Sequence, residues 1–244
     1  MTAPRTPRRR RPTQGALRFR TWGGKREGAG RKPAPGPTRV SHRPRPALAT
    51  RFPVHVTLRL AAGLPNLRAR DGLRTLQLAF ARACERPDFR LVHYCVQKNH
   101  LHLLVEARDH AALARGMQGL SIRIAKRLNL LWQRRGSVFA DRYHGRILRT
   151  PAETRAALSY VLCNTRRHTP QQQRAATWLD PCSSAVYLDG WRGFTPRAPA
   201  TESPPVVTPR TWLLRVGWRR LGLLIPDARP GPTRRASRSA PPSS

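Results

Sequence analysis

The apolar positions in the first half of the central region predict a strand, a helix and a hairpin. Residues 54–60 alternate in polarity and carry β-branched side chains, a period of two that predicts a strand. Between residues 67 and 86 the apolar positions favour a helix over a strand. Residues 89–96 and 100–106 are predicted as two further strands, and the polar residues 97–99 between them are typical of a hairpin turn.

The second half of this region adds two helices. Between residues 111 and 131 the apolar side chains are spaced by three and four, which predicts a long helix. Residues 137–139 and 146–148 could form short strands or loop. Pro151, with an acid close behind it, is typical of a helix start, and this helix is expected to run to about residue 167. This order of elements predicts an α+β fold in which helices pack on an antiparallel sheet.

Composition divides the chain into three parts. Residues 1–50 contain fourteen basic residues, one acid and many Pro and Gly, and are expected to be a disordered arm that either lies along DNA phosphates or is solvated. Residues 51–194 are expected to form the folded domain. Residues 195–244 are expected to be a linker with a disordered tail. Within it, residues 211–224 predict a short basic helix that docks on the folded domain or on DNA.

The net charge of +35, from 47 basic and 12 acidic residues, indicates a polyanionic partner, chiefly nucleic acid. Arginine supplies 43 of the basic residues, a bias that a GC-rich coding sequence would produce, but such a bias does not explain the scarcity of acids. No apolar run approaches the roughly eighteen residues of a membrane span, and the N-terminus lacks the apolar core of a signal peptide. The four cysteines form no C-x-x-C pair, which is typical of reduced thiols in a cytosolic protein.

The first candidate for chemistry is the pair His100 and His102, on either side of Leu101. In an extended strand, positions i and i+2 point to the same face, so the two imidazoles are expected to project side by side. Such a pair on a rigid element can bind a metal ion. The alternative is two histidines on a polar strand face.

The second candidate lies on the last predicted helix, where Tyr160 and Asn164 are spaced i and i+4 and therefore share a face. A tyrosine phenol can attack a phosphodiester and store the bond as a phosphotyrosine. The Asn164 amide oxygen could complete a metal site begun by the two histidines, and this ligand set suits Mn, Zn or Mg. Taken alone, Tyr160 would be a packing residue and Asn164 a residue at the end of a helix.

Other residues are weaker candidates for this chemistry. Tyr143 is the rival nucleophile, but no partner at i+4 on an assured helix supports it, so it is interpreted as a packing or DNA-contacting residue. His55 could face the same site, although a structural role is favoured. Arg123, Lys126 and Arg127 form either a phosphate-contacting face or a solvated one.

The chain resembles a known family in two stretches. The first resembles the N-H-x-H-L-L motif of the single-tyrosine HUH transposases, named for their His-hydrophobe-His pair; it is Val96-Gln97-Lys98-Asn99-His100-Leu101-His102-Leu103-Leu104. The run 136–144, followed by Leu158-Ser159-Tyr160-Val161-Leu162-Cys163-Asn164, is similar to the REP-associated tyrosine transposase branch. Two departures are Thr165 after Asn164, where the branch often has proline, and Lys98, which replaces a common proline.

This resemblance implies a ferredoxin-like antiparallel sheet with helices on it. It also implies metal-dependent cleavage of single-stranded DNA at imperfect hairpins, with a 5′-phosphotyrosine intermediate, a free 3′-OH and subsequent rejoining. His100, His102 and Asn164 would bind Mg or Mn, and Tyr160 would be the nucleophile. The implied partner is single-stranded or hairpin DNA, without a membrane; a homodimer is compatible with this, and the expected location is bacterial, cytoplasmic and nucleoid-associated.

Two other functions stay open from the sequence. The first is a non-catalytic, domesticated protein that binds DNA hairpins with the same fold, against which stand the intact His100, His102, Tyr160 and Asn164. The second is an RNA-binding protein that uses the same charge, against which stands the lack of an aromatic RRM-type signature.

Overall fold

The computed structural model describes residues 47–83, 85–164, 177–200 and 203–226. The predicted arm therefore lies outside the described residues except for its last four positions, as do the tail beyond residue 226 and the predicted helix end at 165–167. Leu48 is only 8% exposed and packs in the core, so the described fold begins inside the last residues of that predicted arm.

A five-stranded sheet forms the centre of the fold. Its strands are β1 (Val54–Arg59), β2 (Glu85–Arg86), β3 (Phe89–Val96), β4 (His100–Ala107) and β5 (His144–Ile147). They lie in the order β2-β3-β4-β1-β5, and every neighbouring pair is antiparallel. With one helix between β1 and β3 and another between β4 and β5, this is the β-α-β-β-α-β order of a ferredoxin-like fold, so the predicted fold class is confirmed.

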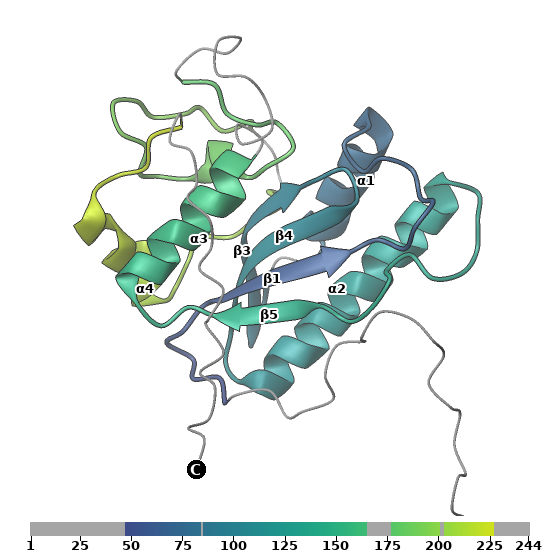
Figure 1. Cartoon of the computed structure of the whole chain (residues 1–244), viewed down its shortest axis with the longest axis horizontal. Coiled ribbons are helices and arrows are strands. Elements are labelled where there is room, and N and C mark those ends of the chain that lie inside the picture. Colours follow the sequence, from purple (N-terminus) through teal and green to yellow (C-terminus); the bar gives the residue numbers. More distant parts are fainter. Residues whose placement is uncertain (1–46, 84, 165–176, 201–202, 227–244) are drawn as a thin grey trace, which may run out of the picture. The chain divides into compact units, whose positions relative to one another are not determined.

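One face of the sheet is covered by the two crossover helices, α1 (Arg70–Ala81) and α2 (His110–Leu131) (Figure 1). Alternate strand residues point to this side because side chains alternate between the faces of a strand. Those of β1 and β4 that join this core are Val54, Val56, Leu58, Leu101, Leu103 and Val105. The other set of alternate residues, including His100 and His102, is therefore left for the opposite face.

That opposite face is covered by α3 (Pro151–Cys163) and by the C-terminal part of the described chain (Figure 1). The latter contains the short helices η3 (Ala185–Tyr187), α4 (Trp212–Arg215) and η4 (Gly217–Leu221). A second apolar cluster forms here, in which Leu104 of the sheet, Leu158 of α3 and Trp218 of η4 are all buried. The predicted basic segment at 211–224 thus docks on the folded domain.

Two predicted helices are shorter in the structure. The first begins at Arg70 because the backbone N–H of Leu67 donates to the carbonyl of Lys98 at 3.0 Å, which ties that residue to the β3–β4 turn. The segment 211–224 is broken into α4 and η4, since Gly217 packs so closely under the Trp212 ring that an added Cβ would lie 2.6 Å from it.

The start of α3 is fixed by local chemistry. The Thr150 side chain accepts a hydrogen bond from the backbone N–H of Glu153 at 3.1 Å, and Pro151 occupies the first turn, as the sequence predicts. The Glu153 carboxylate in turn accepts from the Arg149 backbone at 2.7 Å and from Arg146 of β5 at 3.0 Å. These contacts join α3 to the edge strand and set the direction in which the helix crosses the sheet.

On the sheet face covered by α1 and α2, one added methyl group should lower the stability of the fold strongly. A Cβ at Gly116 of α2 would collide with the fully buried ring of Phe89, which has no space into which to move. We expect Gly116→Ala to lower the free energy of unfolding by about 1–3 kcal/mol. Gly119→Ala on the same helix is the matched control, because its Cβ would approach only the Arg86 guanidinium and should gain up to about 1 kcal/mol of helix propensity. Urea unfolding of both variants tests this, and equal midpoints would contradict it.

Within the described residues, none of the helices combines the length and the apolar character needed to cross a bilayer.

Candidate active site

His100 and His102 lie side by side on β4, on the sheet face covered by α3. Their ring centroids are 4.7 Å apart, while Leu101 and Leu103 point into the α1–α2 core. The expectation that the two imidazoles share one strand face is therefore confirmed as geometry. His102 is only 4% exposed, and His100, at the first position of the strand, is half-buried.

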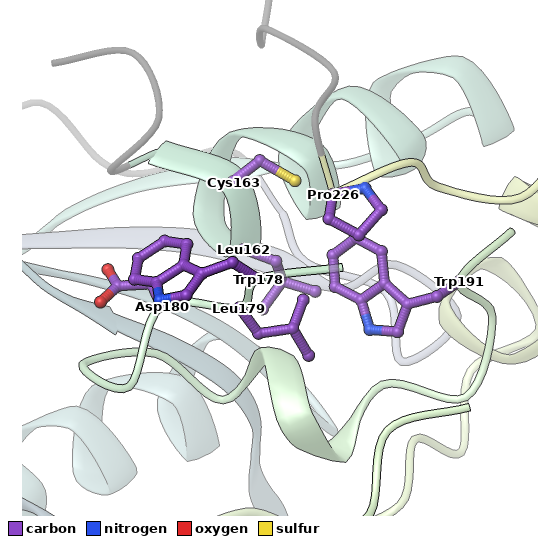
Figure 2. Close-up of a pocket in the computed structure, with 7 residues that line it drawn as sticks. All are labelled: Leu162, Cys163, Trp178, Leu179, Asp180, Trp191 and Pro226. Atoms are coloured by element: carbon purple, nitrogen blue, oxygen red, sulfur yellow. The ribbon is translucent and has the colours of Figure 1, made fainter. Parts of the chain in front are cut away.

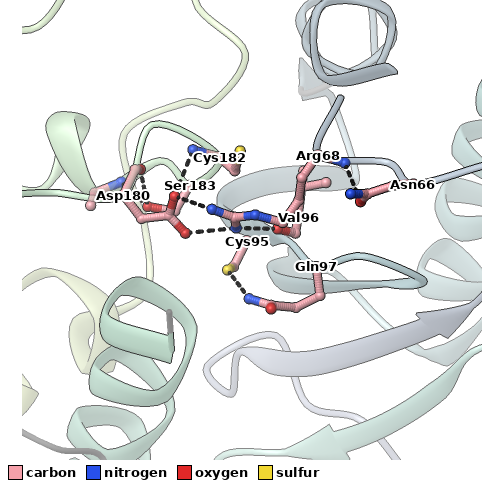
Figure 3. Close-up of polar contacts among 9 residues, drawn as sticks. Asn66, Arg68, Cys95, Val96, Gln97, Asp180, Cys182 and Ser183 are labelled. Carbon is pink, nitrogen blue, oxygen red and sulfur yellow. Dashed lines mark hydrogen bonds and ion pairs between the residues drawn. The ribbon is translucent and has the colours of Figure 1, made fainter. Parts of the chain in front are cut away.

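The turn that carries these histidines is anchored from two sides, one of which is the cluster around Arg68 (Figure 3). The Arg68 guanidinium donates to both carboxylate oxygens of Asp180, at 2.8 and 2.9 Å, and to the carbonyl of Val96 at 2.9 Å. The carbonyl of Asn99 accepts from the backbone N–H of Leu60 at 2.9 Å. A bidentate pair with a carboxylate as buried as that of Asp180 fixes both partners, so the end of β3 and the start of β4 are held in place.

Tyr160 reaches this histidine pair from α3. Its hydroxyl oxygen lies 3.4 Å from Nε2 of His102, and the two rings meet edge to face with centroids 4.9 Å apart. The structure thus brings together three of the four predicted site residues, from two elements that are about sixty positions apart in the sequence. What these residues do in catalysis stays a prediction.

His55 and Thr57 of β1 complete the surroundings of His102. Thr57 is paired in register with His102, and its hydroxyl lies 3.2 Å from Nδ1; His55 Nε2 lies 3.3 Å from the same atom. The alternation of β1 places His55 and Thr57 on one face, but only the pairing of β1 with β4 shows that this face is the one with the histidines. His55 therefore faces the candidate site, an alternative that the sequence left open, and Thr57 is a neighbour that the sequence did not single out.

Burial keeps two of these imidazoles neutral. Burial, with smaller effects from His55 and His100, lowers the pKa of His102 to about 3. Burial also lowers the pKa of His55 to about 4, with further effects from Arg146 and His144. A neutral imidazole carries a lone pair on one nitrogen. Each ring therefore has a lone pair that can bind a metal at neutral pH.

The contacts of the histidines fit a metal with Nε2 ligands. The Asn99 side-chain oxygen lies 2.9 Å from Nδ1 of His100, so Nδ1–H donates to it and Nε2 carries the lone pair. A donation from Nδ1–H of His102 to Thr57 would likewise direct the Nε2 lone pair towards Tyr160. No group of three or more His, Cys, Asp or Glu side chains in the described ranges could hold a metal ion. A metal here would need an oxygen ligand of another kind.

Asn164, the predicted oxygen ligand, lies at the end of α3, one turn beyond Tyr160, and is 3% exposed. Within the part of the chain that the structure describes, no hydrogen bond joins it to His102. Beside the last turn of α3 there is a cavity of only about 10 Å³ (Figure 2), room for about one water molecule. The role of Asn164 as a ligand remains a prediction.

The alternative residues lie elsewhere. Tyr143 is 9% exposed and packs in the core between the sheet and helices α1 and α2, on the face opposite His102, which supports its interpretation as a packing residue. Arg123, Lys126 and Arg127 belong to α2, which also covers that opposite face. They do not line the histidine–tyrosine site.

Residues 65–161 match the family model described as "Transposase IS200 like", a stretch that contains His100, His102 and Tyr160 and ends three positions before Asn164. Over this region the chain is similar to the IS200-like transposases. The predicted family is thereby confirmed at this level.

A solved structure of a REP-associated tyrosine transposase bound to a REP hairpin is also similar to this chain. The two are 18% identical, the match covers 59% of this chain and 82% of the other, and the TM-score is 0.44. No curated protein matches the chain.

The buried side chain of His93, next to this site, should make the stability of the fold depend on pH. Burial lowers the pKa of His93 from 6.5 to about 4, and its Nδ1 lies 3.1 Å from the Ser184 hydroxyl. Between these pH values the unfolded chain binds a proton that the folded chain does not bind. The free energy of unfolding should therefore fall by up to about 3 kcal/mol as the pH drops from about 6.5 towards 4.

Urea unfolding of the wild type and of His93→Gln at about pH 7 and pH 5 measures this effect. The variant should lose less stability between the two pH values, because the glutamine amide does not titrate. Identical losses in the two proteins would contradict the prediction.

Proposed function

We propose that this protein is a metal-dependent single-strand DNA transposase that cleaves and rejoins DNA at hairpin-type repeats through a 5′-phosphotyrosine. The observation that carries the proposal is the 3.4 Å approach of the Tyr160 hydroxyl to Nε2 of His102, in a region that matches the IS200-like transposases. A phenol next to a pair of imidazoles that can hold a metal is an arrangement for nucleophilic attack on a polarised phosphate.

The proposed step is a displacement at phosphorus. The Tyr160 oxygen forms a bond to the phosphorus of one phosphodiester, and the bond from that phosphorus to the 3′-oxygen breaks. The phenol proton goes to water, and the departing 3′-oxygen takes up a proton to become the free 3′-OH. The reverse attack by a 3′-OH releases Tyr160 and rejoins a strand, so no external energy source is needed.

Within this proposal, Thr57 and His55 hold the His102 ring in place. Both lie within 3.3 Å of Nδ1. Either of them can accept a hydrogen bond from Nδ1–H and thereby keep the Nε2 lone pair turned towards Tyr160. Partners of this kind fix both the tautomer and the orientation of a histidine ring.

The residues that would hold a divalent metal, Mg or Mn, are His100 and His102, with Asn164 as the proposed third ligand. Bound there, the metal would polarise the scissile phosphate and stabilise the charge that develops on it. DNA oxygens and water would fill the remaining positions, which a catalytic site needs to leave open.

The substrate follows from the charge and from the resemblance to the REP-associated branch. A net charge of +35 favours any nucleic acid, so the charge alone gives affinity rather than selectivity. The motifs around His100 and Tyr160 resemble those of enzymes that act on small imperfect hairpins. Action on chromosomal repeats would place the protein at the nucleoid of a bacterial cell.

The test is incubation of the protein with hairpin oligonucleotides from the flanks of its own gene, with Mg or Mn. We expect a covalent protein–DNA adduct that survives denaturation, and hairpins should outcompete perfect duplex of equal length, with affinity falling steeply as salt rises. Hairpin binding without any adduct would favour a non-catalytic hairpin-binding protein. Equal affinity for duplex and hairpin would argue against hairpin repeats as the substrate.

A further inference from the structure

A cavity of about 510 Å³ lies next to the sheet at β3, beyond the histidine–tyrosine site. This volume is within the range of about 300–1,000 Å³ that small-ligand sites occupy. Its walls are largely apolar and come from three segments, which are residues 92–93 of β3, residues 187–189 and residues 204–219. A flat, uncharged group such as a nucleobase could be buried in it.

The strand wall of the cavity belongs to the same sheet face as the candidate active site. His93, in its wall, is paired in register with Leu104 of β4, whereas Cys95, two positions further along β3, is paired with His102. Two residues along a strand span about 7 Å. A DNA strand held at Tyr160 would therefore have its neighbouring nucleotides near this cavity.

The wall formed by residues 204–216 is pinned by buried polar contacts. The Glu106 carboxylate, 4% exposed, accepts from the backbone N–H of Arg210 at 2.9 Å and of Thr211 at 2.7 Å. The Arg90 guanidinium donates to the carbonyl of Thr208 at 2.5 Å. Because these contacts hold the wall at several points, the cavity is part of the packed fold.

The rim of the cavity is cationic. Arg219 lies 3.2 Å from Asp189, so these two lining residues largely offset each other. Arg215, also in the lining, is exposed and has no ion pair among the described residues. Its guanidinium is available for an anion such as a phosphate.

Next to this rim stands an exposed aromatic side chain. Trp212 is 47% exposed, and the Arg220 guanidinium lies over its ring at 4.9 Å. Val216, 49% exposed, lines the cavity and precedes Gly217, against which the Trp212 ring packs. Aromatic rings and arginine planes are surfaces on which unpaired bases stack.

We propose that this cavity, with the Trp212–Arg220 pair at its edge, binds an unpaired nucleotide of the DNA substrate. The base enters between the apolar walls, Arg215 contacts a phosphate, and the adjacent base stacks on the Trp212–Arg220 pair. This inference rests on the proposed function for the identity of the DNA. It does not depend on cleavage.

The test measures binding of the full chain to a fluorescent thymidine oligonucleotide and to the same oligonucleotide with abasic sites. Val216→Asp introduces a carboxylate at the cavity rim, and Ile122→Asp on α2, with the same exposed fraction of 49%, is the matched control. Arg215→Ala is matched by Arg74→Ala, an exposed position on α1. All four positions are exposed, so the fold should tolerate these changes.

We expect Val216→Asp to weaken binding of the thymidine oligonucleotide about tenfold relative to Ile122→Asp, the effect of losing one base contact. Arg215→Ala should weaken binding more than Arg74→Ala does. On the abasic oligonucleotide the Val216→Asp and Ile122→Asp proteins should differ much less, because no base is left to enter the cavity.

Photocrosslinking from an iodouracil in the oligonucleotide locates the contact. It should label the peptide that contains residues 204–219 in the wild type and lose that label in Val216→Asp. Equal affinities within each matched pair, or labelling only outside that peptide, would overturn the proposal. Absence of a Tyr160 adduct would bear on the proposed function alone, since binding is measured here without cleavage.

Discussion

Tyr160→Phe should abolish the covalent protein–DNA adduct, with a loss of cleavage on the order of a thousandfold or more. The change removes the single oxygen that lies 3.4 Å from Nε2 of His102 and keeps the ring that packs edge to face on it. Folding and hairpin affinity should therefore survive. Denaturing electrophoresis of labelled hairpin with each protein measures the adduct, and anisotropy with the same hairpin measures binding.

Tyr143→Phe is the matched control, since it removes the same atom from a tyrosine on the opposite face of the sheet. It should retain the adduct. An adduct that persists in Tyr160→Phe and disappears in Tyr143→Phe would show that the nucleophile is Tyr143 and not Tyr160. If neither change affects the adduct, a tyrosine nucleophile at either position is wrong.

The pairing of the two histidines could be predicted from the sequence because it depends only on the period of one strand. The helix that carries Tyr160 could be predicted from its proline and its acid for a similarly local reason. The sequence allowed His55 to face the site but could not place His55 or Thr57 there, because their position depends on which strands become neighbours and in which register. Patterns within β1 do not contain that information.

The structure of residues 211–224 also depends on contacts that their own sequence does not contain. The sequence between Thr211 and Leu224 predicts one amphipathic helix, and its apolar residues do pack on the fold. It breaks at Gly217 because that residue fits under Trp212, and its start is held by Glu106, more than one hundred positions earlier. The cavity formed by this packing had no signal in the sequence, since its walls come from three separate segments.

His102→Ala and His100→Ala should each reduce cleavage by about a hundredfold to a thousandfold while leaving most of the hairpin affinity. The arginines supply the salt-dependent attraction to DNA, whereas these two imidazoles supply the lone pairs that would hold a metal at the scissile phosphate. EDTA should have the same effect on the wild type, and added Mn or Mg should restore its activity. Asn164→Ala should cleave more slowly and recover in part with excess Mn, because it weakens the metal site without removing the nucleophile.

The matched control is Thr57→Val, which keeps the shape of the side chain next to His102 but removes the hydroxyl that lies 3.2 Å from Nδ1. It should cost less than His102→Ala, about tenfold to a hundredfold, the usual effect of losing a partner that orients a ligand. Metal titrations of cleavage separate the two roles: Thr57→Val and Asn164→Ala should shift the metal concentration that is needed, whereas His102→Ala should not recover at any concentration. Full cleavage by a protein that carries both histidine substitutions, or cleavage unaffected by EDTA, would show that the imidazoles of β4 do not hold a catalytic metal.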